Sequence, residues 1–222
     1  MNRILVWDLP LRLFHWLLVL LVVVSFVSAK IGGNAMQVHM LSGYTILTLL
    51  LFRLLWGFAG GTHARFACFV RGPAAVSAYL RSLVRGDATQ HLGHNPAGAW
   101  SVILMLLALL AQAATGLFAN DDIATEGPLA KFVSKALSDR ITGIHHLNLW
   151  LLYVLIGLHL AAIAFYFLHK RENLVQPMLT GFKDAANSGG ETAPKQGKNW
   201  TAALLLAACA TCVYLLIKLP AG

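Results

Sequence analysis

Four histidines within long apolar stretches of this 222-residue chain are the residues best placed to do chemistry: His15, His39, His145 and His159. An ionisable side chain is costly in hydrocarbon and usually has a function there. Neutral imidazole is also a common ligand of metal ions. These four side chains are therefore candidate ligands, and their spacing shows how they can combine.

The spacing predicts two pairs of histidines, one near each face of a membrane. His145 and His159 are 14 residues apart, so in one helix they point within about 40° of each other and lie about 21 Å apart along the axis. With the N-terminus in the cytoplasm, His39 and His145 each lie about 6 Å below the outer surface. His15, about 5 Å above the inner surface, matches His159, about 27 Å below the outer one. His146 faces away from His159, which favours His145.

Paired imidazoles suit haem better than a bare metal ion. Two imidazoles on opposite faces of a porphyrin give a six-coordinate iron that carries electrons. Zinc and copper usually gather three or four ligands in one place, and Gly43 leaves room for a ring face beside His39. The alternative, histidines that only form hydrogen bonds between helices, does not explain the matched depths. We therefore expect two haem b groups, one held by His15 and His159 and one by His39 and His145.

The elements that position these histidines are predicted to be transmembrane helices. The chain is 58% hydrophobic and 12% charged, which is far too apolar for one soluble domain. A hydrocarbon core of about 30 Å needs roughly 20 residues of helix. Five apolar stretches reach about that length: 13–29, 35–58, 97–119, 141–168 and 200–217. They lack the alternation of barrel strands, so the sequence predicts an all-α integral membrane protein.

The net charge of +8 is explained by topology and does not indicate a nucleic-acid partner. With the N-terminus in the cytoplasm, 12 of the 17 lysines and arginines fall on the cytoplasmic side. This asymmetry agrees with the positive-inside rule and places the C-terminus in the periplasm after the fifth helix. No Asp or Glu lies within the five stretches, which disfavours a transporter, because transporters generally need a buried carboxylate.

An alternative reading of the first stretch is a cleavable signal peptide. Arg3, the apolar run and the small residues before Lys30 resemble such a peptide. Asp8 and His15 are atypical of one, and we favour a retained helix. Cleavage would remove His15 from the chain.

The chain divides into three parts. Residues 1–183 form a predicted four-helix di-haem transmembrane bundle. Residues 184–199 are rich in small and polar residues and are typical of a flexible cytoplasmic linker. Residues 200–222 hold one additional C-terminal transmembrane helix, which contains no histidine. Within the first part, residues 73–84 predict an amphipathic helix on the membrane surface, because their apolar residues recur at helical spacing.

Several motifs resemble the bacterial cytochrome b561 family, and within it the b-type cytochrome subunit of nickel-iron hydrogenases. The opening VWDLPLRLFHW at residues 6–16 is the most specific of them. The likeness continues in FRLLWG at 52–57, RGP at 71–73 and LGHNPAG at 92–98, and is completed by His145, His146 and His159. It covers about residues 3–183, and the fifth helix departs from it.

The resemblance implies a di-haem core in the bacterial inner membrane, with the same pairing of histidines. Electrons would pass between ubiquinone or menaquinone and a periplasmic c-type cytochrome or redox enzyme. Arg12 and Arg53 lie near the inner face, where either can neutralise haem propionates or simply snorkel to the membrane surface. His63, His91 and His94, in the cytoplasmic loop, are candidates for a quinone site. No residue is given a catalytic role, and homo-oligomers are compatible with the sequence.

Two other functions stay open at this point. The protein can be an enzyme in itself, which oxidises superoxide at the outer haem and passes the electron to quinone. That function needs cations on the outer side to attract an anion, and four are present there: Lys30, Lys131, Lys135 and Arg140. Acidic residues on the same side weaken this argument. The other function is a non-redox transporter or scaffold, which an absorption spectrum without haem bands would indicate.

Overall fold

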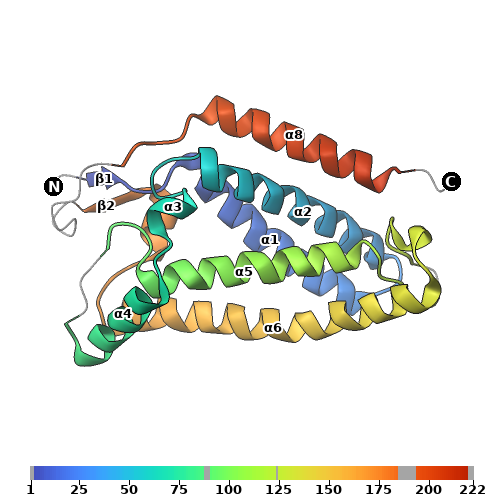
Figure 1. The fold of residues 1–222 in the computed structure, drawn as a ribbon, viewed down its shortest axis with the longest axis horizontal. Helices are drawn as coiled ribbons and strands as arrows, with labels where there is room; N and C mark the ends of the chain where they lie inside the picture. Colours follow the sequence, from blue (N-terminus) through green and yellow to red (C-terminus); the bar gives the residue numbers. More distant parts are fainter. Residues whose placement is uncertain (1–2, 88–90, 124, 185–193, 220–222) are drawn as a thin grey trace. The chain divides into compact units, whose positions relative to one another are not determined.

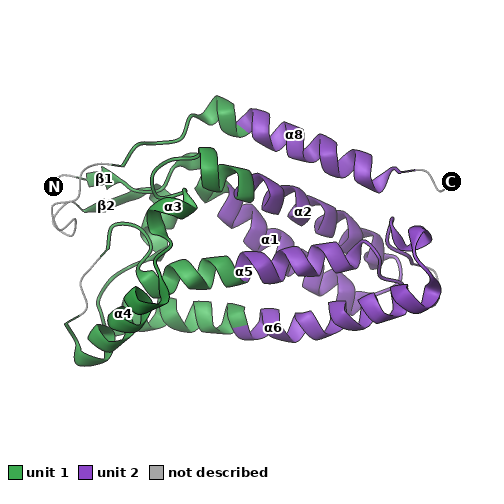
Figure 2. Cartoon of the chain, in the orientation of Figure 1, with its two compact units in different colours: residues 1–13, 54–104, 155–202 green, residues 14–53, 105–154, 203–222 purple. Residues whose placement is uncertain are grey.

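The structure, a computed structural model, describes residues 3–87, 91–123, 125–184 and 194–219, and it is mostly helical over them (Figure 1). The chain splits into two compact units (Figure 2). Unit 1 comprises residues 1–13, 54–104 and 155–202, and unit 2 comprises residues 14–53, 105–154 and 203–222. Each of the five long helices belongs to one unit over its first part and to the other over its second part.

Five helices of the described chain are long and apolar enough to cross a membrane, which confirms the number expected. They are α1 (Leu9–Ile31), α2 (Ala35–Ala59), α5 (Pro96–Gly116), α6 (Lys135–Leu168) and α8 (Asn199–Ile217). The shorter helices are α3 (Phe66–Phe69), α4 (Pro73–Arg85), η1 (Ala130–Phe132) and α7 (Val175–Thr180). The amphipathic helix expected over residues 73–84 is α4.

The fourth membrane helix begins earlier than its apolar stretch indicates. The stretch starts at residue 141, whereas α6 starts at Lys135. Its first turns contain charged residues and are stabilised by the pair of Lys135 with Asp139 at i,i+4, whose Nζ–Oδ1 distance is 2.6 Å. Ser134 caps the helix by accepting a hydrogen bond from the Leu137 amide at 3.3 Å. The apolar stretch therefore shows which part of α6 can lie in lipid, and the helix begins before this stretch.

Asp8 organises the N-terminal part of unit 1. Its Oδ1 accepts a hydrogen bond from the Leu11 amide at 3.0 Å and so caps α1. Its Oδ2 accepts from the Gly61 amide and from Trp56 Nε1, both at 3.2 Å. Asp8 and Trp56 are buried. The carboxylate therefore joins the start of α1 to the end of α2 and to the loop that follows.

A short antiparallel sheet in unit 1 joins the N-terminal segment to the segment after α6. Strand β1 (Arg3–Leu5) pairs with β2 (Phe182–Asp184), with Ile4 opposite Lys183. The Lys183 ammonium, which is mostly buried, forms a 2.7 Å salt bridge with Glu172 and donates a 2.8 Å hydrogen bond to the His91 carbonyl. These strands were not predicted, because each has only three residues.

In unit 1, a pair of tyrosines joins α4 to α6. The Tyr79 and Tyr166 hydroxyls form a hydrogen bond, and Asn95 Nδ2 donates to the Tyr166 hydroxyl at 2.9 Å. Burial and this contact raise the pKa of Tyr79 well above its usual value, so its hydroxyl is neutral. Asn95 also caps α5 by accepting from the Gly98 amide at 2.7 Å.

In unit 2, α8 contributes to a buried apolar cluster. Leu47 of α2, Leu117 and Leu129 after α5, and Val213 of α8 form its centre. The Lys131 ammonium donates a 2.5 Å hydrogen bond to the Leu219 carbonyl just after α8. The later part of α8 is therefore packed against the other elements of unit 2.

The expected flexible linker, 184–199, falls largely outside the described residues, which omit 185–193. Asp184 belongs to β2 and Asn199 begins α8. Between them, the backbone of Lys195 forms two hydrogen bonds with Thr62 in unit 1, at 2.8 Å and 3.0 Å. This part of the segment is held by the loop after α2.

Candidate functional site

Two of the four predicted ligands lie side by side in unit 2. His39 projects from α2 and His145 from α6, and their ring centroids are 6.3 Å apart with the planes nearly perpendicular, at 85°. A metal ion bound between two imidazoles, with metal–nitrogen bonds of about 2 Å, separates the ring centres by roughly 6 Å. The pair therefore has the spacing of two axial ligands to one metal ion.

Each ring of this pair is oriented by a backbone carbonyl of another helix. The Nδ1–H of His39 donates to the Ser25 carbonyl of α1 at 2.9 Å. The Nδ1–H of His145 donates to the Gln112 carbonyl of α5 at 3.0 Å. A carbonyl oxygen only accepts, so the proton of each ring is on Nδ1 and the lone pair is on Nε2. This is the arrangement that supports histidine ligands of metals and fixes which nitrogen can bind.

A chain of amides beside His145 is consistent with the same tautomer. Gln112 Oε1 accepts a 2.7 Å hydrogen bond from Asn148, which also donates to the Ala108 carbonyl at 2.9 Å. The amide NH2 of Gln112 therefore faces His145 Nε2, at 3.1 Å, and donates to it. Nε2 acts as an acceptor. Sequence reasoning missed Gln112 and Asn148, whose signal was a carboxamide within an apolar stretch.

The two imidazoles border a cavity of about 270 Å3 that lies within unit 2. Gly43 lines it one turn after His39, and a Cβ at this glycine would meet no atom within 4 Å. At Gly116, another lining residue, a Cβ would lie 3.1 Å from Cε1 of His145. Gly43 thus leaves open space in the cavity, and Gly116 makes room for the His145 ring.

The donor set of this cavity fits haem better than a bare ion. Over the described residues, no group of three or more His, Cys, Asp or Glu side chains could hold a metal ion. Two imidazoles are too few for a zinc site, whereas haem brings four nitrogens of its own and needs only axial ligands. The residues present therefore fit haem.

His146 lines the same cavity, with its ring centroid 6.2 Å from that of His145. It is exposed, whereas His145 is half-buried and makes the hydrogen bonds to Gln112 and Thr115. These differences support the choice of His145 over its neighbour.

The other predicted pair is divided between the units. His15 belongs to unit 2, on α1, and its ring packs perpendicular to Trp16 at 5.0 Å. His159 belongs to unit 1, on α6. Both are half-buried. Their pairing stays a prediction.

The two predicted arginines have different surroundings. Arg12 Nη1 donates to the Leu179 carbonyl at 2.9 Å, and its buried Nε has no hydrogen-bond partner within the part of the chain that the structure describes. Arg53 is 2% exposed, and a guanidinium buried to this degree requires compensating acceptors or charge. A role for either in binding propionates stays a prediction.

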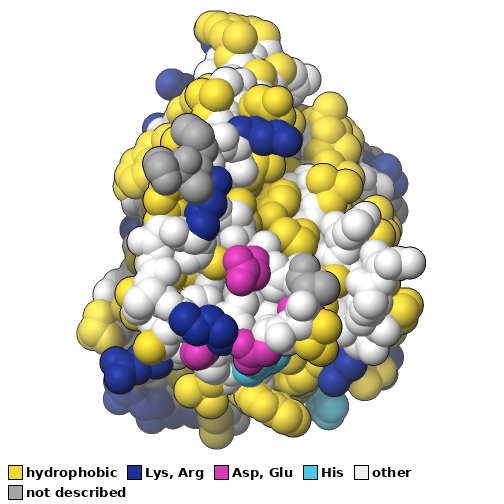
Figure 3. Space-filling model, turned by 90° about the vertical axis from the view of Figure 1, so that its right-hand side faces the viewer, with side chains coloured by type: hydrophobic (Ala, Val, Ile, Leu, Met, Phe, Trp, Pro, Cys, Tyr) yellow, Lys and Arg dark blue, Asp and Glu magenta, His cyan; other side chains and the backbone are white. Residues whose placement is uncertain are grey.

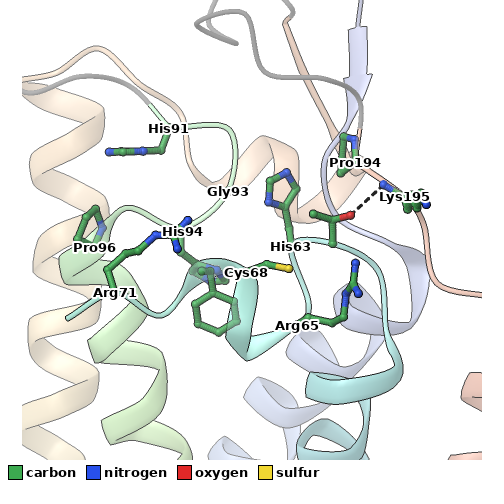
Figure 4. A pocket seen from close by; sticks show the side chains of 12 residues that line it. His63, Arg65, Cys68, Arg71, His91, Gly93, His94, Pro96, Pro194 and Lys195 are labelled. Carbon is green, nitrogen blue, oxygen red and sulfur yellow. Dashed lines mark hydrogen bonds between the residues drawn. The ribbon is translucent and has the colours of Figure 1, made fainter. Parts of the chain in front are cut away.

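The three loop histidines line a different cavity, within unit 1 (Figure 4). His63, His91 and His94 border it together with Arg65 and Arg71. Trp7 packs on His94, with ring centroids 4.8 Å apart, and on His63 at 5.9 Å. The sequence placed these histidines in one loop and did not indicate the arginines that join them.

The charged residues predicted on the outer side form a mixed surface on unit 2. Lys135 pairs with Asp122 and with Asp139, and Asn120 Nδ2 donates to Asp139 at 2.9 Å. Figure 3 shows carboxylates near the middle of this face, with lysines and arginines beside them. The face has no uniform charge.

Comparison with known proteins agrees with the geometry. Residues 6–181 match the family model of prokaryotic cytochrome b561. The probable Ni/Fe-hydrogenase B-type cytochrome subunit of Azotobacter chroococcum is 25% identical, over 80% of this chain and 87% of the relative. That of Rhizobium leguminosarum is 26% identical, over 81% and 89%. No solved structure matches the chain significantly. The family model covers most of the sequence, and five helices are long and apolar enough to cross a membrane. The chain is therefore a multi-pass membrane protein of the prokaryotic cytochrome b561 family, a b-type cytochrome that binds haem b and transfers electrons.

Proposed function

We propose that this chain transfers electrons between the quinone pool and a periplasmic redox partner, through two haem b groups in the bacterial inner membrane. The observation that carries the proposal is the pair of His39 and His145, with their rings 6.3 Å apart and both Nδ1 atoms bound to carbonyls. Bound haem supplies a one-electron iron couple whose potential depends on its ligands and their hydrogen bonds.

The residues of unit 2 would hold the outer haem. His39 and His145 present Nε2, and the Ser25 and Gln112 carbonyls keep the rings from rotating. A carbonyl that accepts from Nδ1–H also makes the ligand more basic. The Gln112 amide, which donates to His145 Nε2 at 3.1 Å, would have to release this nitrogen for it to serve as a ligand.

His15 and His159 would hold the inner haem. The support is their position in the helices: His145 and His159 are 14 residues apart in the one helix α6, so they are about 21 Å apart along its axis. Arg12 and Arg53 would neutralise the propionates of this haem. Two haem groups at such levels would span most of a hydrocarbon core of about 30 Å.

The identity of the partners rests on chemistry and on the relatives. Quinone dissolves in the bilayer, which makes it the natural reactant at the inner level. The curated relatives are named as subunits of Ni/Fe hydrogenases, so the periplasmic partner would be a hydrogenase-like redox enzyme or a c-type cytochrome. The charge asymmetry of the sequence supports an N-terminus in the cytoplasm and a C-terminus in the periplasm. Superoxide oxidation has less support, because Lys135 is paired with two carboxylates.

A haem count on ligand variants tests the proposal. Wild-type protein should contain two low-spin b haems per chain, measured by the reduced-minus-oxidised spectrum of purified protein against its concentration. His39→Ala and His145→Ala should each reduce the count to one, and His15→Ala and His159→Ala should do the same at the other level. His146→Ala is the matched control, because it removes an imidazole from the same cavity and should leave both haems in place. One haem in well-folded wild-type protein, or loss of a haem in the control, contradicts the assignment.

Electron transfer is tested separately. Reduced protein is mixed with a soluble quinone analogue, and haem oxidation is followed by stopped flow. His159→Ala should slow this oxidation strongly, and His145→Ala should leave it nearly unchanged while blocking exchange with an added c-type cytochrome. Equal quinone rates in the wild type and in His159→Ala would place the quinone reaction on the outer side.

A further inference from the structure

The cavity of unit 1 has a volume of about 740 Å3 and is lined by side chains that carry or can gain positive charge (Figure 4). They are His63, Arg65, Arg71, His91, His94 and Lys195. No carboxylate is among the described residues that line it. The nearby Glu172 is engaged in its ion pair with Lys183, and Asp8 accepts hydrogen bonds from the start of α1 and from Trp56. The electrostatics of the cavity therefore favour an anion.

The backbones that present these cations are fixed. Trp100 Nε1 donates to the Arg71 carbonyl at 2.8 Å, and the backbone of Lys195 is held by its two hydrogen bonds with Thr62. The Nε of Arg65 is buried and has no hydrogen-bond partner among the described residues. A buried donor without an acceptor is costly, and an oxyanion in the cavity would supply acceptors to this guanidinium.

Two of the imidazoles, those of His63 and His94, are held by contacts with neighbouring rings. His94 lies between Trp7 and Phe69, with ring centroids 4.8 Å from each. A Cβ at Gly93 would lie 2.6 Å from Nδ1 of His63, so a larger residue there would require this ring or the loop to shift. A preorganised set of donors loses little entropy on binding.

The chemistry of the lining selects among ligands. A metal ion is disfavoured, because no three His, Cys, Asp or Glu side chains of the described chain converge on a metal position. A neutral apolar ring gains little from several cationic groups. Arginine forks match the oxygens of phosphate, and they form two parallel hydrogen bonds with it.

The place of the cavity in the chain indicates a source for such a ligand. Thr62 and His63 follow α2, and Pro96 begins α5, so the lining lies at the ends of two candidate membrane helices. Helix α4, which starts just after Arg71, exposes Leu80 and Val84. It has the features of a helix that lies in the headgroup region. In a bilayer spanned by these helices, the cavity would lie near the level of the lipid phosphates.

We propose that this cavity binds a phosphate group through Arg65, Arg71 and the loop histidines, either in the headgroup of an anionic phospholipid or as free phosphate. The two sources share one chemistry, a phosphate oxyanion held by guanidinium forks. The proposal is independent of haem binding, since none of its residues is among the predicted ligands.

The test measures thermal unfolding of full-length protein in nanodiscs. The discs contain phosphatidylcholine alone or phosphatidylcholine mixed with phosphatidylglycerol, and sodium phosphate is compared with sodium chloride at equal ionic strength. The double variant Arg65→Gln/Arg71→Gln removes two cations from the lining. The matched control, Arg81→Gln/Arg85→Gln, removes the same charge from α4 at residues that do not line the cavity.

If a lipid headgroup binds, phosphatidylglycerol raises the unfolding midpoint of the wild type and of the control, and not that of the double variant. If free phosphate binds, sodium phosphate produces this pattern in phosphatidylcholine alone. Either apparent affinity should fall at least tenfold in the double variant, because it loses the charge-assisted hydrogen bonds of two guanidinium groups. Arg65→Lys/Arg71→Lys, which keeps the charge, should retain part of the response and serves if the glutamine variant does not fold. No response of the wild type to either ligand, or an equal loss in the control, overturns the proposal.

Discussion

Gly43 is the position at which a side chain should displace the outer haem and leave the fold intact. A Cβ there meets no atom within 4 Å, and the glycine lines the cavity of about 270 Å3 beside His39. A cavity of about 150 Å3 accommodates benzene, so the phenyl ring of Gly43→Phe would take roughly half of this space. The substitution also gains about 0.5 kcal/mol of helix propensity. We therefore expect folded protein with one haem.

The assay measures haem per chain together with thermal unfolding of the same preparation. Gly43→Phe should reduce the haem count from two to about one, with no loss of soluble, monodisperse protein. The matched control is Gly143→Phe in α6. Gly143 is exposed, its Cβ would also meet no atom within 4 Å, and it does not line the cavity. This control should keep both haems.

Two results would refute the reasoning. If Gly43→Phe retains two haems, the cavity beside His39 is not where the outer haem binds. If Gly143→Phe loses a haem as readily, the loss reflects a bulky residue in any membrane helix and says nothing of the cavity.

Three further predictions concern stability, each measured by thermal or denaturant unfolding in detergent. Asp8→Ala should lower the free energy of unfolding by about 3 kcal/mol, because it leaves buried donors such as Trp56 Nε1 without an acceptor; a loss below about 1 kcal/mol would mean that water replaces the carboxylate. Glu172→Gln should lower the free energy of unfolding by about 3 kcal/mol, since one partner of a mostly buried ion pair is removed. The double variant Glu172→Gln/Lys183→Met should lose less stability than Glu172→Gln alone, and a double variant that loses more would contradict this. Val213→Ala should cost about 2 kcal/mol by creating a cavity against α8 without changing the haem count, and loss of haem in this variant would give the fifth helix a direct part in the site.

The membrane helices were predictable because lipid imposes a simple requirement. Every backbone donor in hydrocarbon needs an internal partner, and a span needs a minimum apolar length. The five stretches satisfied both conditions, and α1, α2, α5, α6 and α8 appear where they were expected. The start of α6 was missed, since Lys135, Asp139 and Arg140 interrupt the apolar pattern and apolarity gives no information on a helix outside the membrane.

The proximity of His39 and His145 was predicted from rise per residue, whereas the hydrogen bonds that orient their rings were not. Helical periodicity gives the depth of a side chain and not the identity of the residue on the next helix. Gln112 and Asn148 orient His145 through contacts between α5 and α6, and such contacts depend on how the helices pack. Strands β1 and β2 were not predicted for a similar reason, because a three-residue strand is defined by the strand with which it pairs.

The hydrogen bonds of the two imidazoles imply that His39 and His145 are oriented only when four helices have come together. The carbonyl that orients His39 belongs to α1, and the carbonyl that orients His145 belongs to α5, while the rings themselves come from α2 and α6. Because neither ring is held by its own helix, neither Nε2 is positioned in a partly assembled chain. A ligand that binds the assembled state alone stabilises it by mass action. Haem bound at this site would therefore stabilise the packing of all four helices, and the Nδ1–H groups of both ligands would stay hydrogen-bonded to the Ser25 and Gln112 carbonyls.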